Sequence, residues 1–235
     1  MSTKEGTDNE KQQGYKAYKR KDFDAAISHF ENAMKLNAQN LEFPYRIAMS
    51  KFKQKKYDDC IEFCGKAVKV GKRNKGDVKV VAKAYVLEGN ARIEAGEADR
   101  GREAIEKAVT FLTSIAKVKD AKGELDECSK FIERAIQVGK ENVVNVFAME
   151  KVMELKAGLN LRYCNADPKK NQKLFLTRMV DVAEDWHDLK AKDKEQYEFC
   201  LGYLELVVQG KYKTVDGEHG NEYFRALALQ GKALR

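Results

Sequence analysis

A period of 34 residues is the feature that most constrains how this chain folds. The segment FDAAISHFENAMKLN at 23–37 recurs 34 positions later as YDDCIEFCGKAVKVG at 57–71. Each copy has an aromatic residue followed by small and apolar residues at spacings of three and four, which is one face of an α-helix. Small side chains on that face let a neighbouring helix approach closely. The pattern therefore predicts a stack of helical hairpins.

Each recurring segment follows another helical stretch, at 10–21 and at 42–55, and a third unit comes after an extension of seven residues. A hairpin of 34 residues has the length of a tetratricopeptide repeat. The three predicted units span 7–41, 41–74 and 82–115. The positions that carry the register are Phe23, Ala26, Ile27, Phe30 and Ala33 in the first unit, Tyr57, Cys60, Ile61, Cys64 and Ala67 in the second, and Gly89, Ile93, Gly101, Ile105 and Ala108 in the third.

The predicted fold class is all-α, a tetratricopeptide-type superhelix of about eleven helices whose C-terminal half has irregular repeats. Residues 1–8 are expected to be a disordered N-terminus, 9–117 to hold the three repeats, and 118–235 to form divergent helical repeats or a capping domain. An echo at 125–139 supports continued repetition. The further helices are predicted at 121–138, 140–158, 169–190, 193–209 and 220–233, with breaks that include Gly139.

Composition agrees with a helical protein. The 235 residues include 2 Pro, and no window approaches an uninterrupted apolar run long enough to span a membrane. The N-terminus lacks the apolar stretch of a secretory signal, and five scattered cysteines fit reduced packing residues. A cytoplasmic protein without a membrane partner is expected. The net charge of +7 arises in residues 1–120, and residues 46–83 hold 12 basic against 4 acidic residues.

Catalytic and metal-binding signals are weak. No phosphate loop, nucleophile elbow or pair of catalytic carboxylates is present, so the chain is expected not to be an enzyme and to need no cofactor or metal. Cys60 and Cys64 fall on repeat positions, which favours packing over metal binding. The weak acidic group around His187 and the single Trp186 are interpreted as structural. An enzyme built in residues 109–235 remains open.

Residues 8–93 resemble the central Hsp90-binding tetratricopeptide domain of the Hop/Sti1 co-chaperones. The stretches that carry the resemblance are GYKAYKRKDFDAAISHFENAMKLN, YDDCIEFCGKAVKVGKRNKGDVK, VAKAY and GN, together with the seven-residue extension. The resemblance implies a concave groove, lined by the first helix of each hairpin, that binds the acidic C-terminus of a heat-shock protein.

In that family a clamp of two Lys, two Asn and one Arg grips the terminal Asp of a peptide that ends Glu-Glu-Val-Asp. Carried over by position, the lysines correspond to Lys11 and Lys83, whereas the other three positions have changed. The predicted peptide-binding residues of this chain are Lys11, Tyr15, Tyr18, Arg46, Lys83 and Leu87, with Tyr15 and Arg46 at the Asn positions, Leu87 at the Arg position and Tyr18 as the pocket aromatic.

Three functions stay open on these residues. The first is a co-chaperone or interaction module that binds an acidic tail through Lys11, Arg46 and Lys83. The second is a scaffold whose groove binds a different protein segment. The third, a basic helical protein that binds nucleic acid, is less favoured because the basic residues are spread over both helices of a hairpin. The sequence does not indicate an oligomeric state.

Overall fold

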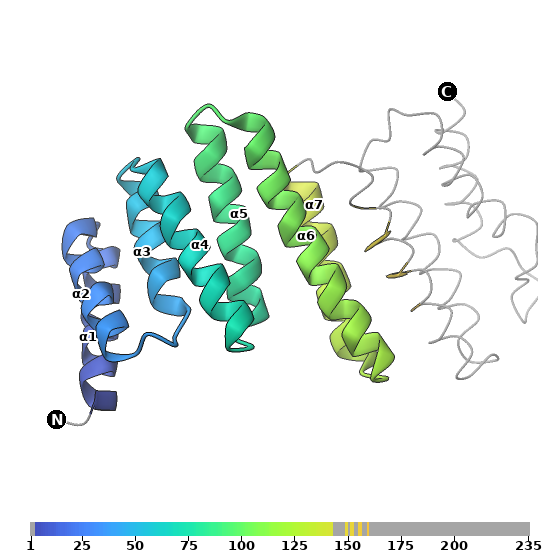
Figure 1. The fold of residues 1–235 in the computed structure, drawn as a ribbon, viewed down its shortest axis with the longest axis horizontal. Helices are drawn as coiled ribbons and strands as arrows, with labels where there is room; N and C mark the ends of the chain where they lie inside the picture. Colours follow the sequence, from blue (N-terminus) through green and yellow to red (C-terminus); the bar gives the residue numbers. More distant parts are fainter. Residues whose placement is uncertain (1–2, 143–148, 150, 153–154, 157–158, 160–235) are drawn as a thin grey trace, which may run out of the picture. The chain divides into compact units, whose positions relative to one another are not determined.

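The structure, a computed structural model, describes residues 3–142 together with 149, 151–152, 155–156 and 159 (Figure 1). The chain divides into two compact units, Met1–Leu112 and Thr113–Arg235. Every regular element in the described part is an α-helix. The helices are α1 (Thr3–Lys19), α2 (Phe23–Leu36), α3 (Glu42–Lys53), α4 (Tyr57–Arg73), α5 (Val78–Glu94), α6 (Ala98–Ala121) and α7 (Leu125–Asn142).

The first unit is a row of helical hairpins, α1 with α2, α3 with α4, and α5 with the first part of α6 (Figure 1). From α1 to α5 each helix packs against the next, and α3 also contacts α5. The contact between alternate helices is typical of stacked hairpins, in which the first helices line one face. The described part of the chain therefore has the all-α, tetratricopeptide-type arrangement predicted from the 34-residue period.

The core follows the repeat register. Ala26, Phe30 and Ala33 on α2 are fully buried, as are their counterparts Cys60, Cys64 and Ala67 on α4. An aromatic pair closes the turn end of each of the first two hairpins. The ring centroids of Tyr18 and Phe23 lie 5.5 Å apart, and those of Phe52 and Tyr57, 34 residues later, lie 5.7 Å apart. The predicted packing positions of the first two units are confirmed. In the third unit Gly89, Ile105 and Ala108 are buried, whereas Ile93 is 41% exposed at the edge of its contact with Gly101.

The hairpin turns repeat in backbone conformation as well. Lys21, Lys55 and Gly96 follow the first helix of successive units, and their φ angles are 63°, 60° and 88°. Left-handed residues commonly terminate helices, and glycine adopts this conformation without steric cost. A lysine therefore adopts the left-handed conformation in the first two hairpin turns, and glycine, the favoured residue, adopts it in the third.

Close contact between helices explains why glycine occurs on packed faces. A Cβ atom on Gly89 of α5 would lie 2.4 Å from Ile105 Cγ1 and 2.7 Å from the carbonyl oxygen of Gly101, both on α6. A Cβ on Gly14 of α1 would lie 2.7 Å from the ring of Phe30. These glycines let the two helices of a hairpin touch.

Two boundaries differ from the sequence prediction. Residues 3–8, expected to be disordered, form the first turns of α1, and the physical reason is packing, since Thr7 is buried and Gly6 lies against the side chain of Leu36 on α2. The break predicted at Gly139 is wrong, because α7 continues to Asn142. Gly139 is instead a buried contact, where a Cβ would lie 2.2 Å from Met149 Sδ.

Several predictions lie outside the described residues. They are the helices expected at 169–190, 193–209 and 220–233, most of the helix at 140–158, and the interpretations of Trp186 and His187. The count of eleven helices therefore stays a prediction, and so does the division at 118–235. Within the described ranges, no helix is long and apolar enough to cross a membrane.

Candidate functional site

The six predicted site residues come from three helices that are each the first of a hairpin. Lys11, Tyr15 and Tyr18 lie on α1, Arg46 on α3, and Lys83 and Leu87 on α5. Spacings of three and four residues place the side chains of one helix on a common face. The repeat thus brings residues that are far apart in sequence onto neighbouring helices.

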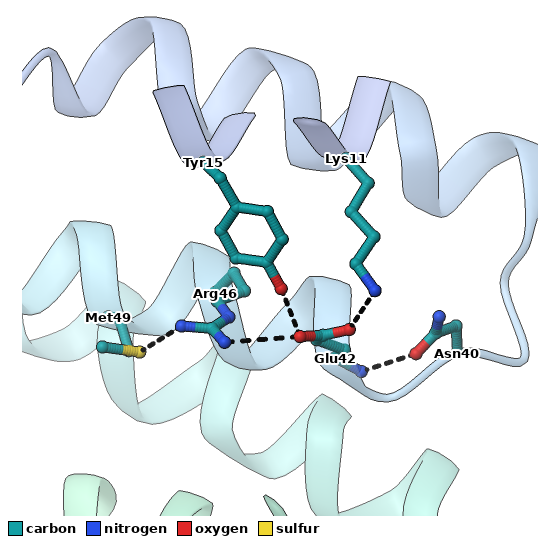
Figure 2. A network of polar contacts seen from close by, with 6 residues as sticks. All are labelled: Lys11, Tyr15, Asn40, Glu42, Arg46 and Met49. Carbon is teal, nitrogen blue, oxygen red and sulfur yellow. Dashed lines mark hydrogen bonds and ion pairs between the residues drawn. The ribbon is translucent and has the colours of Figure 1, made fainter. Parts of the chain in front are cut away.

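A carboxylate that the sequence analysis did not single out joins three of these residues. Lys11 Nζ lies 2.7 Å from Glu42 Oε2, and Arg46 Nη2 lies 3.3 Å from Glu42 Oε1. The Tyr15 hydroxyl donates a hydrogen bond to Glu42 Oε1. Figure 2 shows the Lys11 and Tyr15 side chains extending from α1 toward Glu42 on α3. We call Glu42 with Lys11, Tyr15 and Arg46 the Glu42 cluster.

Glu42 is held at the start of α3. It is the first residue of the helix, and its backbone N–H donates to Asn40 Oδ1 at 3.0 Å. A negative charge is favourable at a helix N-terminus, where backbone N–H groups lack partners within the helix. The start of the helix, the hydrogen bond to Asn40 and the neighbouring cations together position the carboxylate.

Arg46 lies between aromatic rings and the carboxylate. Its guanidinium carbon is 4.8 Å from the centroid of the Tyr15 ring and 5.9 Å from that of Tyr45. Nη1 is 3.8 Å from Met49 Sδ, and Nε is buried without a hydrogen-bond partner among the described residues. Because Glu42 pairs with one guanidinium nitrogen only, the hydrogen-bonding capacity of Arg46 is not exhausted.

The electrostatics of the cluster favour an ionised Glu42 and a neutral Tyr15. Burial opposes charge on Glu42, but the hydrogen bonds from Lys11 and Tyr15 and the nearby positive charges outweigh it and hold its pKa below the usual range. Burial, together with the hydrogen bond to Glu42, raises the pKa of Tyr15 to about 12. The cluster therefore contains two cations, one anion and a neutral hydroxyl over the neutral pH range.

The other three predicted residues do not contact Glu42. The ring of Tyr18 pairs with Phe23, and burial raises the pKa of its hydroxyl. Lys83 is exposed on α5 and forms no ion pair with the described residues. Leu87 is half-buried and packs against the cluster of Ala48, Cys60, Cys64 and Ala91. The structure thus unites Lys11, Tyr15 and Arg46 and leaves Lys83 available to solvent.

A signal for Glu42 was present in the sequence. Glu42 and Arg46 are four residues apart in EFPYR, a spacing that predicts an ion pair on a helix. Nothing local indicates Lys11, which lies 31 positions earlier and reaches Glu42 only when α1 packs beside α3. The Glu42–Arg46 pair could therefore be predicted from spacing, whereas the contact between Lys11 and Glu42 could not.

The cysteines and the possible metal ligands of the described residues do not form a second candidate site. Cys60, Cys64 and Cys128 are buried and form no disulfide among the described residues, and the hydrogen bond with Cys60, added to burial, raises the pKa of Cys64 far above its ordinary value. A thiol in that state is a poor nucleophile and a poor metal ligand. No group of three or more His, Cys, Asp or Glu side chains within the described ranges is arranged to hold a metal ion.

These helical hairpins define a tetratricopeptide-type repeat protein, and comparison with known sequences specifies its relatives. The chain is 33% identical over 132 residues to stress-induced-phosphoprotein 1 of Caenorhabditis elegans, which is 56% of this chain and 41% of that protein. It is 29% identical over 155 residues to the Hsp70-Hsp90 organizing protein of Triticum aestivum, covering 62% of this chain and 27% of that one. The resemblance to the Hop/Sti1 proteins is confirmed.

A solved structure and a family search complete the comparison. The N-terminal domain of stress-induced protein-1 from Caenorhabditis elegans is 32% identical, covers 47% of this chain and 87% of its own, and superposes with a TM-score of 0.46. No protein-family model matches the chain. The matched segments span less than half the length of the worm and wheat relatives.

Proposed function

We propose that this protein is an interaction module that binds an acidic peptide segment, of the kind found at the C-termini of Hsp70 and Hsp90, on the face formed by α1, α3 and α5. The names of its relatives, the Hsp70-Hsp90 organizing proteins, support this choice of partner. A role as a co-chaperone adaptor without catalytic activity follows from the same proposal.

The observation that carries the proposal is the three-donor arrangement around one carboxylate. Lys11, Tyr15 and Arg46 converge on Glu42 from two helices. Charge-assisted hydrogen bonds are about twice as strong as neutral ones, and an arginine can pair with a carboxylate through two nitrogens. A surface that already binds a carboxylate in this way has the donors that a peptide C-terminus requires.

Lys83 extends the positive charge to the next hairpin. It is exposed on α5, and α5 contacts α3, which carries Arg46. A peptide with a terminal carboxylate and an acidic side chain offers two charges, so cations on successive helices suit an extended acidic ligand. In this proposal Lys83 binds one of them, and Tyr18 and Leu87 supply apolar surface beside it.

A second candidate has its own observation. Glu42 cancels one of the two positive charges of its cluster, which lowers the attraction for a polyanionic tail. If the attraction is too low for such a tail, the same face binds a less acidic protein segment, which packs against the rings of Tyr15 and Tyr18. The scaffold function differs from the first because it predicts the same affinity for a segment with or without a free C-terminal carboxylate.

Calorimetry with two forms of one acidic pentapeptide separates the candidates. The first function predicts that the free acid ending Glu-Glu-Val-Asp binds and that the C-terminally amidated peptide binds at least about tenfold more weakly, since a lost charge-assisted contact is worth about 1.5 kcal/mol or more. Lys83→Ala is expected to weaken binding of the free acid. Lys69→Ala, which removes an exposed lysine from α4, is the matched control.

Two results contradict the acidic-tail function. One is equal affinity for the acid and the amide. The other is an equal effect of Lys83→Ala and Lys69→Ala, which indicates general attraction by net charge and not a defined contact.

A further inference from the structure

The Glu42 carboxylate has the chemistry of the ligand that the proposed site binds. Its three partners, Lys11, Tyr15 and Arg46, are all residues assigned to peptide binding by position, and they contact Glu42 from α1 and α3. We infer that Glu42 is an intramolecular ligand of this site, which an incoming peptide carboxylate must displace, and that it therefore determines which tails the site accepts. This inference rests on the proposed function.

Geometry makes displacement feasible. The Glu42 side chain is 24% exposed, and those of Lys11 and Arg46 are 33% and 31% exposed, so solvent and a ligand can reach all three. Arg46 contacts Glu42 through one nitrogen at 3.3 Å, and its Nε has no partner among the described residues. A peptide carboxylate that pairs through two oxygens would bind the guanidinium better than Glu42 does.

The cost of displacement gives the site its selectivity. A displaced Glu42 stays covalently attached beside the site and repels an incoming anion, because like charges a few ångströms apart near a protein surface interact unfavourably. A peptide with one carboxylate only replaces the contacts that Glu42 already makes. A tail with further acidic side chains gains contacts with Lys83 besides, so Glu42 selects for tails that carry several carboxylates.

The test compares Glu42→Gln with the wild-type chain of 235 residues. The glutamine keeps an oxygen that accepts hydrogen bonds from Lys11 and Tyr15 but removes the negative charge. Calorimetry with the free-acid acidic pentapeptide is expected to show about tenfold or greater gain in affinity, the equivalent of one lost charge interaction. The second peptide is a pentapeptide whose only anionic group is its C-terminal carboxylate. It competes with the same Glu42 carboxylate, so it is expected to bind Glu42→Gln measurably and the wild type below the limit of detection.

Glu88→Gln is the matched control for net charge. Glu88 is a part-buried carboxylate on α5 that pairs with Arg92 at 3.0 Å, so this variant removes the same charge from a similar ion pair outside the Glu42 cluster. Circular dichroism of each variant checks that the helices are intact. Glu42→Ala is the second variant if the glutamine alters the helix content.

The outcomes separate this inference from the proposed function. Peptide binding by the wild type with no gain in Glu42→Gln, or an equal gain in Glu88→Gln, overturns the inference and leaves the acidic-tail function standing. Binding by Glu42→Gln alone supports the inference and shows that the wild-type site does not accept this tail. No binding by either protein overturns both.

Discussion

Lys11 Nζ on α1 lies 2.7 Å from Glu42 Oε2 on α3, so an ion pair joins the first helices of two successive repeats. The Tyr15 hydroxyl and Arg46 also contact Glu42, so an anion lies among three of the six predicted site residues. The consequences of these contacts for stability can be measured without any ligand.

The first prediction concerns acid stability. Because the pKa of Glu42 is lowered in the folded protein, its contribution is present above the ordinary carboxyl pKa and is lost as the pH falls through the lowered value. Glu42→Gln is expected to decrease the free energy of unfolding by about 1 kcal/mol at pH 7 and by much less at pH 3. Urea unfolding at both pH values measures the difference, and a pH-independent difference would contradict the ionic role.

The second prediction concerns alkaline stability. The pKa of Tyr15 is about 12 in the folded protein, against about 10 for a free tyrosine. The folded state therefore favours the neutral hydroxyl, and the resulting stability is present below pH ~10 and is lost between pH ~10 and ~12. The chain has 10 tyrosines, so the ultraviolet titration of wild type minus Tyr15→Phe isolates this group. A difference titration centred near pH 10 would refute the burial of the hydroxyl against Glu42.

The third prediction tests close packing of helices. Gly89→Ala introduces a Cβ that meets Ile105 and the backbone oxygen of Gly101, and backbone cannot move aside cheaply. We expect a loss of about 2 kcal/mol in the free energy of unfolding. Gly65→Ala on α4 is the matched control, because nothing lies within 4 Å of its Cβ. That variant should gain ~0.5–1 kcal/mol from helix propensity, and similar effects of both would refute the tight contact.

The fourth prediction concerns the hairpin turns. Lys55 has a φ of 60° where the third hairpin has Gly96 with a φ of 88°. Lys55→Gly removes the steric cost of the left-handed conformation, which is ~1–2 kcal/mol, and adds a smaller entropic cost. The variant should melt at a higher temperature by calorimetric scanning, and Gly96→Ala at a lower one. A decrease on Lys55→Gly would show that the lysine side chain stabilises the turn.

Much of the fold was predictable because the packing positions repeat at constant spacing. Ala26 and Cys60, or Phe30 and Cys64, are identifiable as core from register alone, and each is fully buried. Gly139 was misread because a glycine that breaks a helix and a glycine that accepts a close neighbour look alike in sequence. The contact between Gly139 and Met149 shows that this glycine is of the second kind, and that contact is known only from the packed structure.

The candidate site also has a part that the sequence predicts and a part that it does not. Lys11, Tyr15 and Arg46 were predicted by position, but Glu42, the group that joins them, was not. An ion pair within one helix leaves a four-residue spacing in the sequence, whereas the approach of Lys11 to Glu42 depends on how α1 packs against its neighbours.

The sequence by itself determined the 34-residue period, the helical class and most of the buried positions, because each of these depends on residue type at regular spacing. Its similarity to the Hop/Sti1 proteins was likewise visible in particular stretches of sequence. Only the tertiary structure decided that Glu42 contacts Lys11, Tyr15 and Arg46, that Lys83 is exposed on α5 and that residues 3–8 belong to α1. These are contacts between segments distant in sequence, and their distances are set by the packing of whole helices.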